Sequence, residues 1–145
     1  MGFGLPAALG AQVASPESLV LCISGDGSFQ MNLQEMAVAI VHKLPIKIAI
    51  INNHSHGLVR QFQELFLDQR YSYTLLSDVP DYVKLTEAYG WQGKSVDAAG
   101  STTEVRKSLR WLLTCKGPAL LEIVVPTEDL LEPMVKPGGS LTEVV

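Results

Sequence analysis

The sequence has few of the features that mark several large classes of protein. It contains two cysteines in 145 residues, neither with a cysteine nearby, which predicts reduced thiols of an intracellular protein rather than a disulfide framework or a zinc site. The net charge is −4 and no basic cluster occurs, which argues against a nucleic-acid partner. No apolar run approaches the ~20 residues of a membrane helix, and the first residues do not resemble a secretion signal. We therefore expect a cytoplasmic protein, organellar if eukaryotic, without a membrane partner.

Apolar residues, by contrast, make up 47% of the chain, and helical and strand-like patterns alternate along it. Continuous apolar runs at 19–23 and 46–51 are typical of parallel strands buried on both faces. A weaker strand is expected at 91–96 and a last one at 119–125, with helical patterns between the runs. This order predicts an α/β fold, a doubly wound parallel sheet with helices on both faces. Because the chain opens on a Gly-rich approach to a helix, we expect the fold to lack its first strand or the chain to be a fragment.

Local signals predict where helices begin and where the folded domain ends. Asn32 with Glu35, and Ser101 with Glu104, have the spacing of capping boxes. Asp78 and Pro80 are expected to open a short helix that ends at Gly90. Length predicts a single binding domain over residues 1–126. The remaining 127–145 are rich in proline and glycine and suit an irregular covering segment.

Two short polar motifs follow consecutive strand-like runs. Gly25-Asp26-Gly27 comes after the first run and Asn52-Asn53 after the second. Ligands of open α/β sheets bind beyond the carboxyl ends of the strands. A carboxylate, two glycines and two amides are therefore expected beside a ligand there. Asp26 and Asn53 could hold Mg²⁺ through side-chain oxygens, with a carbonyl near Ser55 as third ligand and diphosphate oxygens filling much of the rest.

The first motif also suits a phosphate group. Gly25 and Gly27 let the backbone approach phosphates without a Cβ clash, and N–H groups around Gly27 and Ser28 favour negative charge. Each motif alone is a weak signal, since Gly-Asp-Gly is commonly a tight turn and Asn commonly fills turns. Both together after consecutive strands, about 24 residues apart, are much less expected by chance.

The pair of motifs resembles the thiamine diphosphate motif, in which Gly-Asp-Gly and Asn-Asn bracket a helix between two strands. A wider resemblance covers essentially the whole chain. It is to the carboxy-terminal domain of the acetohydroxyacid (acetolactate) synthase catalytic subunit. The segments that carry it are Met1 to Ala8, Gly25 to Phe29, Leu44-Pro45, Gln61 to Gln63, Arg70 to Ser72, Pro133 to Val135 and Gly138-Gly139.

The resemblance implies roles for individual residues. Asp26 and Asn53 would bind Mg²⁺ through their side chains, and Ser55 through its carbonyl. Met1 falls where the family has a methionine against the aminopyrimidine of the cofactor. Phe62 stands where the family usually has tryptophan in the substrate pocket, so we expect a wider acceptor pocket. The other cofactor-binding residues implied are Gly25, Gly27, Ser28, His56, Gly57 and Leu58, with His54 in the diphosphate cradle by position.

The resemblance also implies a function. Such enzymes decarboxylate pyruvate and join the two-carbon unit to a second 2-keto acid in branched-chain amino-acid biosynthesis, with thiamine diphosphate carrying the chemistry. The activating glutamate would lie on a missing amino-terminal domain and most of the FAD site on a missing middle domain. No activity is therefore expected from these residues alone. Residues 127–145 would form a lid, the protein would be a homodimer or larger, and a regulatory subunit stays open.

Other functions fit parts of the same pattern. The chain could belong to another thiamine diphosphate carboligase or decarboxylase, such as one using sulfoacetaldehyde or glyoxylate. It could also be a non-catalytic module that binds a diphosphate or a partner domain. A receiver or phosphatase-like fold with Asp26 as nucleophile would need a second acidic cluster and a lysine that we do not identify. A dinucleotide fold would need Gly-x-Gly-x-x-Gly after the first strand.

Several further residues are interpreted as structural. Glu122 interrupts the last strand and is expected to be paired locally, although the sequence does not identify its partner. Phe62, Leu65 and Phe66 lie at helical spacing and would by default belong to a core. Only the resemblance moves Phe62 to a pocket.

Overall fold

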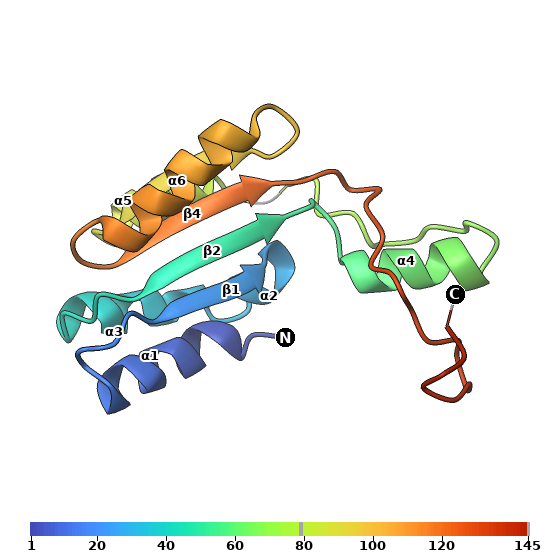
Figure 1. Cartoon of the computed structure of the whole chain (residues 1–145), viewed down its shortest axis with the longest axis horizontal. Helices are drawn as coiled ribbons and strands as arrows, with labels where there is room; N and C mark the ends of the chain where they lie inside the picture. Colours follow the sequence, from blue (N-terminus) through green and yellow to red (C-terminus); the bar gives the residue numbers. More distant parts are fainter. Residues whose placement is uncertain (79, 145) are drawn as a thin grey trace.

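The structure is a computed structural model that describes residues 1–78 and 80–144, and its centre is one parallel sheet. The strands are β1 (Leu21–Gly25), β2 (Lys47–Asn52), β3 (Gln92–Asp97) and β4 (Ala119–Val124). They lie in the order β1-β2-β4-β3 (Figure 1). Gly25 is in register with Ile51, so β1 and β2 end together and the turns that follow them meet at one edge of the sheet.

Helices cover both faces of this sheet, which confirms the predicted doubly wound α/β architecture. One face carries α1 (Gly4–Ala14), α2 (Asp26–Gln30), α3 (Met36–Val41) and α5 (Tyr82–Ala88), whose apolar side chains share a core with Ile48, Ile50 and Leu120. The other face carries α6 (Thr102–Thr114), whose Leu112 packs with Ala49 and Leu121. The two cores hold the strands rigidly and so fix the edge where the turns meet.

Lys47 is the one charged residue in the apolar run of β2, and the structure accounts for it. Its side chain is buried, and its Nζ donates a hydrogen bond to the carbonyl oxygen of Cys115 at 2.8 Å. Cys115 is the residue that ends α6. A cation is favourable at the carboxyl end of a helix, so Lys47 ties α6 to the sheet.

β1 departs from the prediction that it is buried on both faces. Cys22 faces the core, but Leu21 and Ile23 on the other face are exposed, Ile23 by 69%. The reason is that α6 packs on β2, β3 and β4 while β1 is an edge strand. β1 also begins two residues later than the apolar run, so that Gly25 ends the strand instead of following it.

Helix starts were predicted less well than helix positions. Asn32 precedes a 3₁₀ turn, η1 (Leu33–Glu35), and makes no capping bond: its Nδ2 donates to the Gly2 carbonyl, and its Oδ1 accepts from Gln34 Nε2. Glu104 pairs with Lys107 rather than closing a capping box. The cap of α5 is Asp81, whose carboxylate accepts from the Lys84 N–H, and not Asp78 or Pro80. None of the described helices is long and apolar enough to cross a membrane.

The helix α4 (Gly57–Phe66) stands apart from the sheet, beside the carboxy-terminal segment (Figure 1). Its predicted core stripe is therefore not buried: Leu58, Phe62 and Leu65 are exposed, because no sheet lies beneath them. The buried side chain of α4 is Gln61 instead. This helix begins directly after the turn that follows β2.

Candidate functional site

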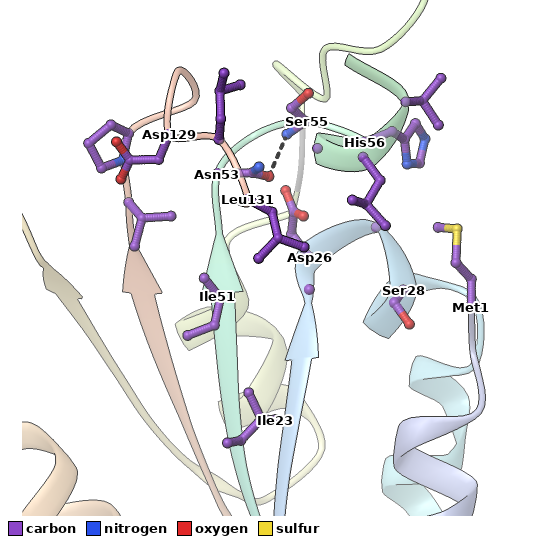
Figure 2. Close-up of a pocket in the computed structure, with 18 residues that line it drawn as sticks. Met1, Ile23, Asp26, Ser28, Ile51, Asn53, Ser55, His56, Asp129 and Leu131 are labelled. Atoms are coloured by element: carbon purple, nitrogen blue, oxygen red, sulfur yellow. Dashed lines mark hydrogen bonds between the residues drawn. The ribbon is translucent and has the colours of Figure 1, made fainter. Parts of the chain in front are cut away.

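A cavity of about 870 Å³ opens at the carboxyl ends of β1 and β2 (Figure 2). Ile23 and Ile51 lie along its floor, and residues from the carboxy-terminal segment, Asp129 and Leu131 among them, lie across it. Ten of the residues predicted to bind a cofactor line this one cavity, and His54 does not. The ten are Met1, Gly25, Asp26, Gly27, Ser28, Asn53, Ser55, His56, Gly57 and Leu58.

Asp26 is the first residue of α2, and its carboxylate is buried with one oxygen that lacks a hydrogen-bond partner among the described residues. The residue is 2% exposed, and the oxygen without a partner is Oδ2. Burial raises the pKa of the Asp26 carboxyl above its ordinary value, although the N–H of Gly27 and the nearby His54 and His56 oppose that shift. A buried carboxylate oxygen without a partner is costly. The cost falls if a cation binds beside it.

A buried tyrosine supports the backbone of this turn from below. The Tyr82 side chain is fully buried, and its hydroxyl donates to the Asp26 carbonyl oxygen at 3.3 Å and accepts from Gln30 Nε2 at 3.3 Å. Burial is the main reason that the pKa of Tyr82 is raised to about 12, with smaller contributions from Asp26 and Glu122. The hydroxyl therefore remains a donor at neutral pH and holds the Asp26 turn on the core.

The turn after β2 is held by hydrogen bonds on several sides. Asn53 Oδ1 accepts from the Ser55 N–H at 3.1 Å, which fixes the amide beside Asp26 in the cavity. Ser55 Oγ donates to the Thr74 carbonyl at 3.0 Å, and the His56 N–H donates to the same oxygen at 2.8 Å. The Ser55 hydroxyl is thus held by Thr74, and metal binding through the Ser55 carbonyl stays a prediction.

Three glycines of the site serve two different purposes. A Cβ on Gly27 would lie 3.0 Å from ring atoms of His56, and one on Gly57 would lie 2.7 Å from Asn53 Nδ2. Both glycines therefore allow close approach within the protein. A Cβ on Gly25 would meet nothing within 4 Å, although Gly25 lines the cavity. Its missing side chain leaves space that packing of the chain itself does not require.

The donor atoms of the site fit Mg²⁺ with a diphosphate better than they fit zinc. Within residues 1–78 and 80–144 no three histidine, cysteine or acidic side chains come together as a metal-binding group. The predicted ligands among the residues that line the cavity are Asp26, Asn53 and Ser55, and the Asp129 carboxylate and Ser28 hydroxyl line the same cavity. Mg²⁺ uses few protein ligands and takes phosphate oxygens and waters for the rest.

Three predicted or considered residues lie elsewhere. The prediction that both Asn52 and Asn53 face the ligand is wrong for Asn52, which is fully buried beneath the turn and does not line the cavity. His54 also lies outside the lining and has a positive φ of 53°. Phe62 is 37% exposed, and its ring packs edge-to-face on Phe66 at 5.1 Å rather than into the cavity. Its place in a substrate pocket stays a prediction.

The sequence did not reveal how the carboxy-terminal segment is fastened to the site. Thr127 Oγ1 donates to the Asn53 carbonyl at 2.8 Å. Gln61 Nε2 donates to the Leu131 carbonyl at 2.7 Å, and Gln61 Oε1 accepts from the Leu131 N–H at 2.9 Å. These bonds join residues about 70 positions apart, and no local pattern announces them. They place Asp129 and Leu131 along the cavity.

Comparison with a protein-family model matches this chain over most of its length. The model described as thiamine pyrophosphate enzyme, C-terminal TPP binding domain, matches residues 1–123. That range contains every residue predicted to bind a cofactor. The match confirms the resemblance inferred from the two motifs.

Curated relatives and a solved structure extend the comparison. The chain is 44% identical over its whole length to the acetolactate synthase isozyme 2 large subunit of Escherichia coli, covering 26% of it. It is 46% identical to the mitochondrial acetolactate synthase catalytic subunit of Saccharomyces cerevisiae, covering 20% of it. It spans about a quarter of such relatives. The thiamine diphosphate-dependent 4-hydroxybenzoylformate decarboxylase of Rhodococcus jostii superposes with a TM-score of 0.76 at 33% identity, over 87% of this chain and 23% of that one.

Proposed function

The chain belongs to the family of thiamine pyrophosphate enzyme C-terminal TPP-binding domains, and from this premise we propose that it is the cofactor-binding part of an acetolactate synthase. The observation that carries the proposal is the buried Asp26 carboxylate, whose unpartnered oxygen lies in one cavity with Asn53 and the other predicted residues. The activity proposed is decarboxylation of pyruvate and transfer of its two-carbon unit to a second 2-keto acid, in branched-chain amino-acid biosynthesis.

We assign the metal to the two turns. Asp26 and Asn53 would hold Mg²⁺ through side-chain oxygens and Ser55 through its carbonyl, and the cation would offset the cost of burying the Asp26 charge. Gly25, left open to the cavity, would let the diphosphate approach the backbone. The diphosphate would also contact Gly27, Ser28, His56 and Gly57.

The apolar part of the cavity would receive the organic rings of the cofactor. Thiamine diphosphate, when bound, supplies a carbanion that accepts the two-carbon unit. Met1 and Leu58 line the same cavity as the floor residue Ile23. These side chains would orient the rings and exclude water.

We propose that residues 1–126 are the binding domain and 127–145 a lid. The support for a lid is the pair of Gln61–Leu131 hydrogen bonds together with the Thr127–Asn53 bond, which fasten the segment over the cavity. Closing this side of the site would keep water from the reacting groups.

The remaining functions are assigned to domains outside this sequence, because it spans only about a quarter of such relatives. We propose that an amino-terminal domain supplies the glutamate that activates the cofactor and that a middle domain binds FAD. We further propose a homodimer or larger assembly, cytoplasmic or organellar, with a regulatory subunit as a further partner. Phe62 is proposed to widen the acceptor pocket relative to a tryptophan.

A second candidate function is supported by the similarity to the Rhodococcus decarboxylase. The chain would then serve another thiamine diphosphate decarboxylase or carboligase. Incubating the complete protein that carries this sequence with pyruvate and competing 2-keto acids separates the two. Acetolactate as the main product supports the first proposal, and an aldehyde released without carbon–carbon bond formation supports the second.

Calorimetric titration tests the cofactor site itself. Thiamine diphosphate is titrated into the complete protein with Mg²⁺ and with a chelator. We expect saturable heat that requires the metal and that disappears in Asp26→Ala. Equal binding with and without Mg²⁺ would contradict the assignment of Asp26 and Asn53 as metal ligands.

A further inference from the structure

We propose that Glu122 is a positioning residue for the metal-binding turn and that it acts through Asn52. This inference rests on the proposed function, because it concerns the geometry of the same site. Neither side chain lines the cavity. Asn52 is the last residue of β2, and Glu122 lies in the middle of the neighbouring β4.

A chain of two hydrogen bonds links Glu122 to the turn. Asn52 Nδ2 donates to Glu122 Oε1 at 2.7 Å. Asn52 Oδ1 in turn accepts from the backbone N–H of His54 at 3.0 Å. His54 lies between Asn53 and Ser55, the two residues of this turn that we assign to the metal. A change at Glu122 is thus two hydrogen bonds away from the metal ligands.

The chemistry of the carboxylate fixes the orientation of the amide. Glu122 Oε1 is the acceptor, so Asn52 turns its NH₂ group toward Glu122. The amide oxygen then faces His54, which is the orientation that the His54 N–H needs. Asn52 is fully buried, so water cannot replace either partner. Without Glu122, the amide would lose what holds its oxygen toward His54.

His54 needs such support because of its backbone conformation. Its φ is +53°, in the left-handed region that residues other than glycine rarely adopt. The structure holds it from both sides: its N–H donates to Asn52, and its carbonyl accepts from the Leu76 N–H at 2.7 Å. This conformation lets Asn53 Oδ1 accept from the Ser55 N–H. Releasing His54 would therefore free both proposed ligands of the turn.

Glu122→Leu is the first test, in the complete protein that carries this sequence. Its apolar side chain has no acceptor. We expect Mg²⁺ affinity, measured by calorimetry in the presence of thiamine diphosphate, to fall a few-fold, which is less than the roughly 10–100-fold typical when a direct partner of a metal ligand is removed. Glu122→Gln retains an oxygen that can accept from Asn52 and should lose much less. Glu104→Leu, which removes an exposed carboxylate paired with Lys107 on α6, is the matched control and should leave the affinity unchanged.

A swap of the two side chains tests the orientation argument and does not depend on Glu122→Leu folding well. Asn52→Asp places two carboxylates against each other and should weaken Mg²⁺ binding. The double variant Asn52→Asp with Glu122→Gln restores one donor and one acceptor, and it keeps an oxygen for the His54 N–H. We expect the double variant to bind Mg²⁺ more tightly than Asn52→Asp alone. The absence of rescue would overturn the proposal.

Hydrogen exchange of the His54 amide in the metal-free protein gives a readout independent of activity. We expect faster exchange in Glu122→Leu than in the wild type and the Glu104→Leu control. A purely structural role would lower the melting temperature of the metal-free protein but leave the Mg²⁺ affinity of the folded protein unchanged, and that result overturns the proposal. If the wild type binds no thiamine diphosphate even with Mg²⁺, the proposed function fails, and if it binds equally well without any metal, the metal assignment fails. If the wild type requires Mg²⁺ and Glu122→Leu binds it equally well, only this inference fails.

Discussion

The two turns that end β1 and β2 face the same cavity but are stabilised in opposite ways. The turn after β2 satisfies its polar groups within the protein, through Asn52, Thr74 and Thr127. The turn after β1 buries the Asp26 carboxylate and leaves one of its oxygens without a partner among the described residues. The turn after β2 is therefore arranged before any ligand binds. The turn after β1 carries an electrostatic cost that a cation would remove. In such a site, the turn after β2 fixes the positions of the ligand atoms, and the turn after β1 supplies the charge that attracts the cation.

The largest expected effect comes from removing the charge of Asp26. Asp26→Asn should lower Mg²⁺ affinity by more than about 100-fold, beyond the range for partners of a metal ligand. The same change should raise the melting temperature of the metal-free protein at pH 7. Burial raises the pKa of the Asp26 carboxyl in the folded state. The carboxyl therefore contributes its full stability at pH values below its ordinary pKa. That contribution is lost as the pH rises through the folded-state pKa and the carboxyl becomes charged.

Thermal unfolding of wild type and Asp26→Asn, with and without Mg²⁺ and thiamine diphosphate, checks both effects. Addition of the ligands should raise the melting temperature of the wild type only. A metal-free Asp26→Asn protein that is less stable than the wild type at pH 7 would show that the buried charge is not costly.

A pair of glycine substitutions separates close packing from ligand space. Gly57→Ala should weaken Mg²⁺ binding on the order of tenfold, since its Cβ would push on the Asn53 amide at 2.7 Å and loosen a ligand of the metal. Gly25→Ala should weaken thiamine diphosphate binding without changing the metal-free melting temperature, because its Cβ meets only the open cavity. Calorimetry and thermal unfolding of both variants measure this. Normal cofactor binding in Gly25→Ala would indicate that the diphosphate does not approach there.

Tyr82→Phe tests the support beneath the Asp26 turn. Loss of the hydrogen bond to the Asp26 carbonyl should cost about 1 kcal/mol in the free energy of unfolding. Chemical denaturation checks the stability loss, and Mg²⁺ titration should show a weaker effect than Gly57→Ala. With a pKa of about 12, the Tyr82 hydroxyl stays protonated across neutral pH, so the variant should not alter the pH dependence of metal binding between pH 6 and 9. A changed pH profile would assign Tyr82 a different role.

The smallest effect is expected at the fastening of the carboxy-terminal segment. Gln61→Leu removes both hydrogen bonds to Leu131 and should speed dissociation of thiamine diphosphate about five-fold, the equivalent of about 1 kcal/mol. Stopped-flow displacement measures this rate. Gln69→Leu, at an exposed position after α4, is the control. Equal rates in the two variants would remove the support for a lid.

Sequence reasoning succeeded where short motifs and strand periodicity acted together. The apolar runs predict where β1 and β2 end and therefore that Asp26 and Asn53 lie beside one ligand, and both residues line one cavity. The sequence also allows Asn52 to be distinguished from Asn53. Successive residues of a strand point to opposite faces, so Asn52 and Asn53 could not both face the ligand while the strand continued through Asn52.

What the sequence could not predict depends on partners distant in the chain. The spacing of Asn32 and Glu35 predicts a helix cap, whereas the Asn32 NH₂ group donates to the distant Gly2 carbonyl and its oxygen accepts from Gln34. Glu122 was expected to be paired, yet its partner Asn52 lies 70 residues away. The exposure of Ile23 follows from the placement of α6 over the other strands. Such outcomes are decided by tertiary packing, which overrides local propensity.

The exposed face of β1 has a practical consequence for work on this chain. Leu21 and Ile23 present apolar surface on a strand at the margin of the sheet, and such strands are templates for pairing with other molecules. We expect this chain on its own to aggregate as its concentration rises. Its solubility would then limit the concentrations at which the polypeptide can be handled.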